Sequence, residues 1–487
     1  MLTGKLPSAE EGLQLNFCKT LACDNFGLSE AQYYLLQRDN PLHPAMICKQ
    51  CGAFPPLLNN RAVLHEQQRL KSLHNSKLAC CNHRDCSNFG LDVLTHREHY
   101  HAFGYSGDRQ RYRCRSCQST FVDRWSGGNR YLVIQQKLLA LLFTGYNVRE
   151  ICRKLTINPK TFYDQLNTIA SRCRRQLYLF DSRLYHHHNK SAIGIASAVV
   201  PLQPQSDNGV LWFVSGEVHS GYILAQDINY SSDGHAPNAQ THDPYSSEPQ
   251  YVSNDFVGFN HKLSENTGSL KSRIELNYQR ILSRGNVEDP LCHLGKLHYP
   301  SKGAVVRPPY TSSAHYLTLA QSLSTFKHID LFMPQEPLLR SAAMSVFLNR
   351  IQEKSIDIVY VMEDTQWISS PKIDVSIIGW WRDRWAINQT ISAGKGICHQ
   401  TDHSPNDDYW LKRASTVNIE QFQHNFYQHF TCLINEPRRK LRPGGLAPLL
   451  DIYRAWHNLC RQDSAGNTPA QSIGITNGPL TLAQLLS

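Results

Sequence analysis

The chain has 487 residues, room for roughly two to four domains, with 41% hydrophobic residues, 18% charged residues and a formal net charge of +10. No apolar run approaches the roughly 20 residues of a membrane span. The N-terminal segment MLTGKLPSAEEG lacks the apolar core of a secretory signal. These features exclude a membrane-spanning or secreted class, and we expect a cytoplasmic protein.

The positive charge is concentrated in one segment. Residues 101–185 contain 15 Lys and Arg against 5 Asp and Glu, a balance of +10. Residues 1–100 contain 10 against 9, and residues 186–487 contain 25 against 26. This distribution favours a surface that binds phosphates, although charge alone also allows a basic face in contact with solvent only.

The first 117 residues contain nine of the 15 cysteines, and their spacing repeats. A C-x4-C pair followed by Asn-Phe-Gly-Leu occurs twice, and a C-x2-C pair follows each copy. Offsets of 63 and 66 residues between the copies indicate a duplication with small loop changes. The eight positions are Cys18, Cys23, Cys48 and Cys51 in the first unit, and Cys81, Cys86, Cys114 and Cys117 in the second.

Four thiolates in each unit are typical of tetrahedral structural zinc, so we predict two Zn²⁺ sites. Disulfides are the alternative, which a reducing cytoplasm and the repeat both disfavour. Cys80 is interpreted as a spare cysteine beside the second set. The cluster of His96, His99 and His101 is interpreted as a surface loop, although it offers substitute ligands.

A helix-turn-helix is predicted inside the basic segment. Residues 131–144 have helical apolar spacing, and Asn147 is placed to cap a second helix over 148–155. Asn158 and Pro159 are typical of the start of a third helix, over 159–175. This geometry lays a recognition helix in the major groove of DNA. A three-helix bundle packed inside the protein is the alternative.

On this interpretation, the exposed start of the third helix supplies the contacts to double-stranded DNA. The candidates for base contacts are Lys160, Thr161, Tyr163 and Asn167. The candidates for phosphate contacts are Arg172, Arg174 and Arg175.

The segment YRCRSCQSTF, a short linker and GYNVREICRKLTINPKTFYDQL together resemble the front end of insertion-sequence transposases. In that family the cysteine ribbon and the helix-turn-helix bind the terminal repeats of the insertion-sequence element. The segments VNIEQF, LLDIYRAWHNLC and TPAQSIG resemble the end of the same enzymes. The resemblance covers about residues 80–230 and 313–487.

The second half alternates strands and helices. Strands are expected at 191–200, 210–218, 221–229, 328–333 and 357–362, and helices at 315–323 and 338–352. This order is expected of a ribonuclease-H-like domain with a mixed sheet. Residues 230–312, which are polar, are expected to form a long insertion or a partly ordered loop.

The resemblance implies a DDE triad of two aspartates and a glutamate that holds two divalent metals. The first aspartate belongs in the first strand, which here reads Gly194-Ile195-Ala196-Ser197-Ala198 without an acid. The second aspartate of the triad belongs at the end of the fourth strand, where the sequence reads Met333-Pro334-Gln335-Glu336. Only Glu420 matches the family pattern, and the available stand-ins are Asp227, Asp330 and Glu336.

We therefore expect a multidomain protein, with two zinc-ribbon-like modules, an all-α helix-turn-helix domain and an α/β ribonuclease-H-like domain. The predicted boundaries are 1–65, 66–128, 129–185 and 190–487. The expected function is sequence-specific DNA binding by a catalytically degenerate, nucleoid-associated regulator or accessory factor, with a homodimer implied by analogy. One alternative is an active transposase that uses Mg²⁺ and a displaced triad. A second is an RNA-binding or protein-assembly module.

Overall fold

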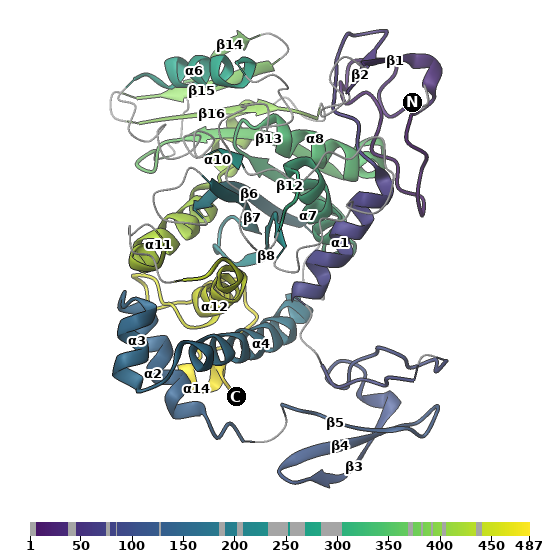
Figure 1. The fold of residues 1–487 in the computed structure, drawn as a ribbon. Helices are drawn as coiled ribbons and strands as arrows, with labels where there is room; N and C mark the ends of the chain where they lie inside the picture. Colours follow the sequence, from purple (N-terminus) through teal and green to yellow (C-terminus); the bar gives the residue numbers. More distant parts are fainter. Residues whose placement is uncertain are drawn as a thin grey trace. The chain divides into compact units, whose positions relative to one another are not determined.

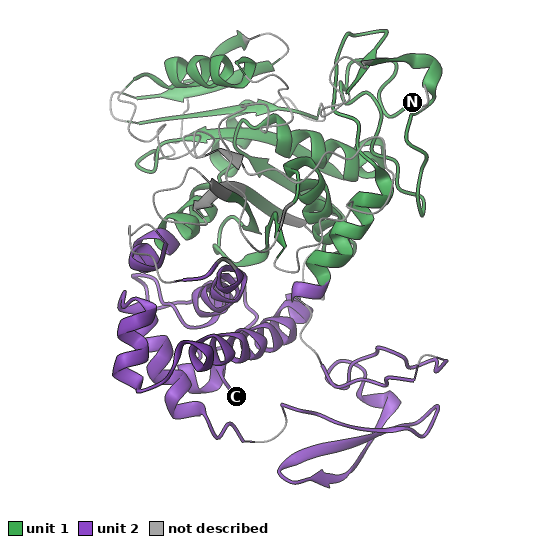
Figure 2. Cartoon of the chain, viewed as in Figure 1, with its two compact units in different colours: residues 1–71, 188–425 green, residues 72–187, 426–487 purple. Residues whose placement is uncertain are grey.

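The structure is a computed structural model. It describes residues 6–37, 45–74, 78–83, 85–125, 128–184, 190–201, 208–231, 252–253, 268–283, 304–368, 374–380, 383–390, 393–401, 406–434 and 441–487. These residues fall into two compact units, which Figure 2 colours separately. Unit 1 contains residues 1–71 and 188–425, and unit 2 contains residues 72–187 and 426–487.

Unit 1 is built around a mixed sheet of nine described strands (Figure 1). The strand order is β10-β7-β6-β12-β13-β16-β15-β14, and β8 also pairs with β7. The strands are β6 (Lys190–Pro201), β7 (Asn208–Glu217), β8 (Ile223–Ile228), β10 (Val252–Ser253), β12 (His328–Met333), β13 (Ile356–Glu363), β14 (Ser376–Trp380), β15 (Asp383–Gln389) and β16 (Gly394–His399).

The centre of this sheet has the strand order β8-β7-β6-β12-β13. Strands β6, β12 and β13 are parallel to one another, and β7 is antiparallel to both of its neighbours, β6 and β8. The mixed sheet confirms the α/β class and is consistent with a ribonuclease-H-like fold. The strands β14, β15 and β16 were not expected from the sequence, and they extend the sheet beyond β13 through antiparallel pairs. The run Val210–Val214 is fully buried, as expected for a strand covered on both faces.

Helices cover both faces of the sheet, and the two-residue period of β7 separates the faces. Phe213 and Ser215 face His315 of α7, whereas Trp212 faces Phe422 of α11. The helices of unit 1 are α1 (Asn60–His74), α6 (Leu270–Leu282), α7 (Pro308–Ser322), α8 (Pro337–Val346), α9 (Leu348–Gln352), α10 (Asp407–Arg413) and the first half of α11 (Val417–Ile434). Two helices cross the boundary between the units: the last residues of α1 and the second half of α11 belong to unit 2.

Much of the predicted insertion, residues 230–312, lies outside the described residues. Within the described part, α6 begins at a Ser269 cap, and Leu270 packs against Gly394 and Gly396 of β16. Two short strands, β9 (Tyr230–Ser231) and β11 (Ala304–Val305), pair with each other at the two ends of the insertion. They form a small two-stranded sheet apart from the main sheet.

The first cysteine module belongs to unit 1 and packs on α7 and α8. It contains the hairpin β1 (Tyr34–Gln37) and β2 (Ala45–Cys48). The Lys19 ammonium donates to Ser341 Oγ of α8 at 2.5 Å, and the Asn59 N–H donates to the Tyr310 hydroxyl of α7 at 3.1 Å. The module is therefore anchored to the sheet domain by polar contacts.

Unit 2 combines the second cysteine module, the helix-turn-helix and the C-terminal helices. The module holds the sheet β3 (Tyr100–Ser106), β4 (Arg109–Cys114) and β5 (Thr120–Val122). The helices are α2 (Leu132–Phe143), α3 (Val148–Leu155), α4 (Pro159–Leu184), α12 (Leu446–Leu459), α13 (Pro469–Ser472) and α14 (Leu482–Leu485). Helix α4 continues nine residues beyond the predicted end because its second half packs against α12.

Among the described residues, no helix is long and apolar enough to cross a membrane. Each compact unit contains more than one of the predicted modules, so the four predicted domain boundaries stay predictions.

Candidate metal centres and nucleic-acid interface

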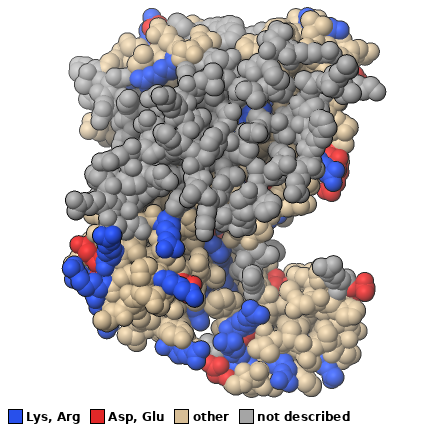
Figure 3. All heavy atoms as spheres, in the orientation of Figure 1, with Lys and Arg blue, Asp and Glu red and all other residues tan. Residues whose placement is uncertain are grey.

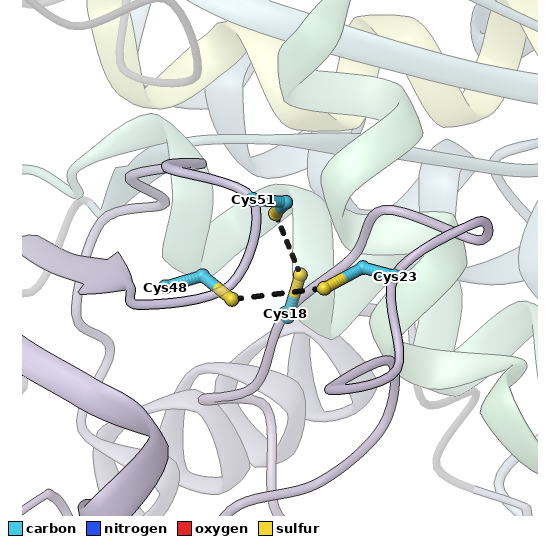
Figure 4. A group of neighbouring side chains, drawn as sticks. All are labelled: Cys18, Cys23, Cys48 and Cys51. Carbon is cyan, nitrogen blue, oxygen red and sulfur yellow. Dashed lines mark hydrogen bonds between the residues drawn. The ribbon is translucent and has the colours of Figure 1, made fainter.

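The first four-cysteine group brings two pairs of thiols to one point (Figure 4). The Sγ atoms of Cys18 and Cys51 lie 3.5 Å apart, and those of Cys23 and Cys48 lie 3.8 Å apart. All four sulfur atoms lie within 4.8 Å of one another, and three of the four side chains are buried. The loop after the second cysteine and the C-x2-C turn therefore converge as the spacing predicts.

The second group repeats this geometry. Its Sγ separations are 3.4 Å for Cys81 and Cys117 and 3.7 Å for Cys86 and Cys114. In the first unit the Asn25 amide donates to Cys48 Sγ, and in the second the Asn88 amide donates to Cys114 Sγ, both at 3.3 Å. The duplication thus includes a hydrogen-bond donor to one thiol as well as the thiols themselves.

Two further repeated residues hold each loop in place. Gly27 and Gly90 both have φ of +75°, a backbone conformation that glycine adopts without steric cost. The hydroxyls of Tyr34 and Tyr100 accept the backbone N–H of the first cysteine of their unit, at 2.8 and 3.3 Å. Each hydroxyl also donates to a backbone carbonyl of the same loop. The Asn-Phe-Gly-Leu repeat therefore has a structural reason.

Both groups fit a tetrahedral metal. A tetrahedron with metal–sulfur bonds of about 2.3 Å has edges of about 3.8 Å, which is close to the separations of the paired thiols. The side chain and backbone of Ser119 lower the pKa of the Cys117 thiol to about 6 through hydrogen bonds. A thiol of this kind readily becomes the thiolate that zinc binds. Two buried four-cysteine groups are thus compatible with two structural zinc sites, and Cys80 lies outside both.

The helix-turn-helix forms where the capping residues predict it. The Asn147 side chain accepts the Glu150 N–H, and the Glu150 side chain accepts the Asn147 N–H, which is a capping box. Thr156 adopts a left-handed conformation in the turn, and the Asn158 side chain accepts the Thr161 N–H at 2.8 Å to begin α4. The inner face of α4 is fully buried through Phe162, Leu166 and Ile169.

The predicted base-contacting residues lie at the start of α4 with different exposures. Lys160 and Asn167 are exposed, and Thr161 is half-buried. The Tyr163 hydroxyl accepts the backbone N–H of Arg442 at 2.8 Å, and the Arg442 guanidinium lies over the Tyr163 ring. Tyr163 therefore has a packing role within unit 2.

The three predicted phosphate-contacting arginines all have partners within unit 2. Arg174 forms an ion pair with Asp451 of α12 at 2.7 Å, and Arg175 lies 3.5 Å from Asp123 of the second cysteine module. Arg172 is only 7% exposed and donates to the Leu486 carbonyl at 2.8 Å. These contacts dock α4 onto its neighbours, a role that the sequence pattern did not indicate.

The position expected for the first catalytic aspartate is filled by apolar packing. Gly194 in β6 pairs with Gly216 of β7 and Phe332 of β12. A Cβ atom at Gly194 would lie 3.0 Å from both Ile419 Cγ1 and Val218 Cγ1. A carboxylate at this position would need both neighbours to move.

The three stand-in acids have structural partners. Glu336 is fully buried and caps α8 by accepting the Leu338 N–H. Asp227 accepts from His315 Nδ1 at 2.6 Å, and His315 Nε2 lies 2.6 Å from Ser215 Oγ. Because Ser215 and His315 are fully buried and Asp227 is 4% exposed, this Ser-His-Asp chain has no access to a substrate.

Asp330 belongs to a third cluster that has ligand-type side chains. Asp330, Asp357 and His328 offer atoms within 4.8 Å of one another on β12 and β13. Arg413 of α10 donates to Asp330 Oδ2 at 2.5 Å, and His328 Nε2 lies 2.9 Å from Asp357. The described residues thus form an ion-paired cluster here, with no third carboxylate.

Glu420, which the resemblance assigns to the triad, lies at the start of α11 beside Glu363, a glutamate that the sequence pattern did not indicate. The Glu420 carboxylate accepts from Thr416 Oγ1 at 2.8 Å. Burial raises the pKa of Glu420, and the nearby charge of Glu363 adds to the rise against the lowering effect of the Thr416 hydrogen bond. Glu363 is bound by Lys395 Nζ at 3.1 Å, so the described residues do not offer three carboxylates for a pair of Mg²⁺ ions.

Comparisons with known proteins give a distant structural similarity. No protein-family model matches the chain, and no curated protein matches it. Among solved structures, a cryo-EM structure of a piggyBac transposase synaptic complex with hairpin DNA is similar at a TM-score of 0.27 and 9% sequence identity. The similarity covers 67% of this chain and 64% of the transposase chain, which is less than two thirds of its length.

Proposed function

We propose that the protein binds duplex DNA in a sequence-specific way, that it derives from an insertion-sequence transposase, and that it acts as a regulator or accessory factor. The observation that supports this most is the placement of the helix-turn-helix. The capped start of α4 presents Lys160 and Asn167 to solvent, within the segment that contains the whole excess of positive charge. Figure 3 shows Lys and Arg side chains gathering over the described part of unit 2.

In the proposed interface, α4 supplies the contacts to bases and α3 supplies positive charge. Lys160 and Asn167 lie seven residues apart, about two turns of α4, so both side chains point to the same side of the helix. Asn167 has the amide that pairs with adenine in the major groove, and Lys160 has the ammonium that pairs with guanine or with a phosphate. Exposed Arg149 and Arg153 of α3 supply charge without sequence information.

The two zinc modules have structural roles in this proposal. Each four-cysteine group would bind one Zn²⁺ ion, which contributes folding energy because the unfolded chain does not preform the site. The first module would stabilise the sheet domain, to which Lys19 and Asn59 anchor it. The second would stabilise the surface next to α4, to which Arg175 anchors it.

The sheet domain is proposed to be catalytically silent. The support is the packing at Gly194 and the ion pairing of Glu363, because two-metal catalysis needs carboxylates that converge on open space. The domain would then serve as a scaffold. The second proposed class, an active strand transferase, predicts cleavage that depends on Mg²⁺ or Mn²⁺.

One experiment separates these classes. Zinc-loaded protein is used to select binding sites from a random duplex library, and the selected site is tested for salt-dependent binding and for cleavage. We expect Lys160→Ala and Asn167→Ala to reduce sequence preference, by about 1–3 kcal/mol for each lost base contact. Lys71→Ala, an exposed lysine of α1, is the matched control for lost charge.

The proposal fails if selection yields no preferred duplex, or if single-stranded RNA competes better than duplex DNA. Metal-dependent cleavage by the wild type that disappears in Glu420→Ala would establish the active transposase instead.

A further inference from the structure

Unit 2 contains a cleft of about 680 Å³ between the second cysteine module and the helices α2 and α4. Its volume lies within the roughly 300–1,000 Å³ that is typical of sites for small organic groups. Its walls are basic and aromatic, and they include Arg109, Arg124, Arg130, Arg172, Trp125 and Tyr131. All of these residues belong to unit 2.

The cleft has an excess of positive charge. Four arginines line it, and Asp108 is the one acidic residue among its described lining residues. Burial lowers the pKa of Arg172, and the nearby charges of Arg175 and Arg109 lower it further. The cationic form of Arg172 is therefore destabilised in the protein alone, and an anion in the cleft would relieve this repulsion.

Arg172 also has an unused hydrogen-bond donor. The residue is 7% exposed, and its Nε has no hydrogen-bond partner among the described residues, although Nη1 donates to the Leu486 carbonyl. A buried donor without a partner is costly, and a phosphate oxygen is the acceptor that best matches a guanidinium. This donor belongs to a side chain that lines the cleft.

The aromatic side chains form stacked layers with arginines. The Arg172 guanidinium lies 5.0 Å from the Trp125 ring centroid, and the Arg130 guanidinium lies 5.2 Å from that of Tyr131. Aromatic rings and guanidinium planes are the surfaces on which unpaired bases stack. In a duplex each base is stacked between its neighbours, so duplex DNA cannot use such surfaces.

A row of amides completes the lining. The Asn129 amide donates to Gln135 at 2.7 Å, and the Gln135 amide donates to Gln165 at 2.8 Å. Side chains of this type bind the edge of a base that is free of its partner. Phosphate binding, stacking and edge recognition thus meet in one cleft.

We propose that this cleft binds an unpaired nucleotide of a DNA strand, at an end or junction of the duplex that the helix-turn-helix holds. The phosphate lies against Arg172, and the base stacks on the layers formed by Trp125 and Tyr131. This inference rests on the proposed DNA-binding function and adds a second class of contact to it.

The test uses the full zinc-loaded chain and two forms of the selected duplex, one blunt and one with a short single-stranded extension. Fluorescence anisotropy at fixed salt is expected to show binding about tenfold tighter for the extended form, because each stacked base adds to affinity. A 2-aminopurine in the extension should lose fluorescence when it stacks in the cleft.

Trp125→Ala and Tyr131→Ala should each reduce the ratio between the two affinities, and exposed Tyr131 covers the case in which Trp125→Ala does not fold. Tyr105→Ala is the matched control, since Tyr105 is 68% exposed in β3 and does not line the cleft. The ratio should stay at its wild-type value in this variant.

Equal affinities of the wild type for the blunt and extended forms would overturn the inference and leave duplex binding intact. Failure to bind either form would overturn the proposed function together with the inference. Competition by a free mononucleotide as effective as by the extended strand would show a nucleotide-binding site and overturn the assignment to a strand.

Discussion

A glycine at position 194 shows how one residue limits what the sheet domain can do. Gly194 and its β7 partner Gly216 both face Ile419 of α11, whose side chain fills the space above the two strands. The helix approaches the sheet closely here because neither strand has a Cβ. The same close approach leaves no space for a larger side chain at position 194 unless Ile419 and Val218 move.

We predict that Gly194→Asp destabilises the protein and restores no cleavage. The new Cβ would lie 3.0 Å from two buried side chains, and the carboxylate would be buried without a partner. The expected cost is about 3–5 kcal/mol for the charge, against roughly 1–3 kcal/mol for Gly194→Ala. Urea unfolding measures both, and Gly379→Ala, with open space around it, is the control. A stable Gly194→Asp variant would contradict the packing explanation.

A second residue-scale prediction concerns the buried chain of Ser215, His315 and Asp227. His315→Leu removes one hydrogen-bond partner from each of the other two side chains and leaves the Asp227 carboxylate buried. We expect a loss of about 3–5 kcal/mol, as found when one member of a buried pair is removed. Thermal unfolding at neutral pH measures this loss of stability.

The Ser215-His315-Asp227 chain has no solvent access, so an esterase assay of the wild type should give no activity. Measurable hydrolysis would refute the structural role.

At the scale of elements, the two cysteine modules share a local design and differ in what surrounds it. The thiols, the asparagine donor, the glycine turn and the tyrosine are repeated. Strands β3 and β4 are longer than β1 and β2, and most of β3 is exposed. The local sequence therefore specifies the four-cysteine group, and the strands attached to it determine which surface each module presents.

We predict that Asn88→Ala weakens zinc binding in the second module and leaves the first unchanged. The Asn88 amide donates to Cys114 Sγ, and loss of such an outer contact lowers metal affinity by about 10–100-fold. Competition with a chromogenic chelator should show one of two zinc ions released earlier. Asn25→Ala, the equivalent change in the first module, is the matched variant. If Asn88→Ala caused early release of both zinc ions, or of neither, the assignment of the Asn88 contact to the second zinc site would be wrong.

At the scale of the whole molecule, the chain returns at its C-terminus to the unit that contains the helix-turn-helix. Helix α12 packs on α4 through the Arg174–Asp451 ion pair and a second pair between Arg454 and Asp181. Phe143 of α2 stacks on Trp456 of α12, with ring centroids 4.5 Å apart. The helices of the proposed DNA interface thus depend on residues far along the sequence.

We predict that deletion of residues 426–487 abolishes DNA binding and leaves zinc binding intact. Without α12, the buried second half of α4 would face water, and the helix-turn-helix would lose much of its core. Circular dichroism should show the loss of helix, and metal analysis should still give two zinc ions per chain. An isolated fragment of residues 80–185 should bind poorly for the same reason. Wild-type affinity in the truncated chain would contradict this.

The sequence by itself determined the features that depend on neighbouring residues. The cysteine spacing, the Asn147 and Asn158 caps and the apolar period of the helices indicated the four-cysteine groups and the helix-turn-helix. Capping acts within a few residues, and each cysteine pair lies within one short segment of the chain. The missing acid at Gly194 was also visible from the strand alone.

Only the tertiary structure decided what the charged side chains contact. Arg172, Arg174 and Arg175 have the same charge and lie on one helix, yet each meets a different partner from a distant part of the chain. The strands β14 to β16 and the return of α12 were likewise not predicted. The three strands pair with their neighbours in sequence, but strand preference depends on the packing around a segment more than on its local sequence. The cleft at Arg172 exists only because the second cysteine module, α2 and α4 meet there. Electrostatic and packing energies depend on that arrangement.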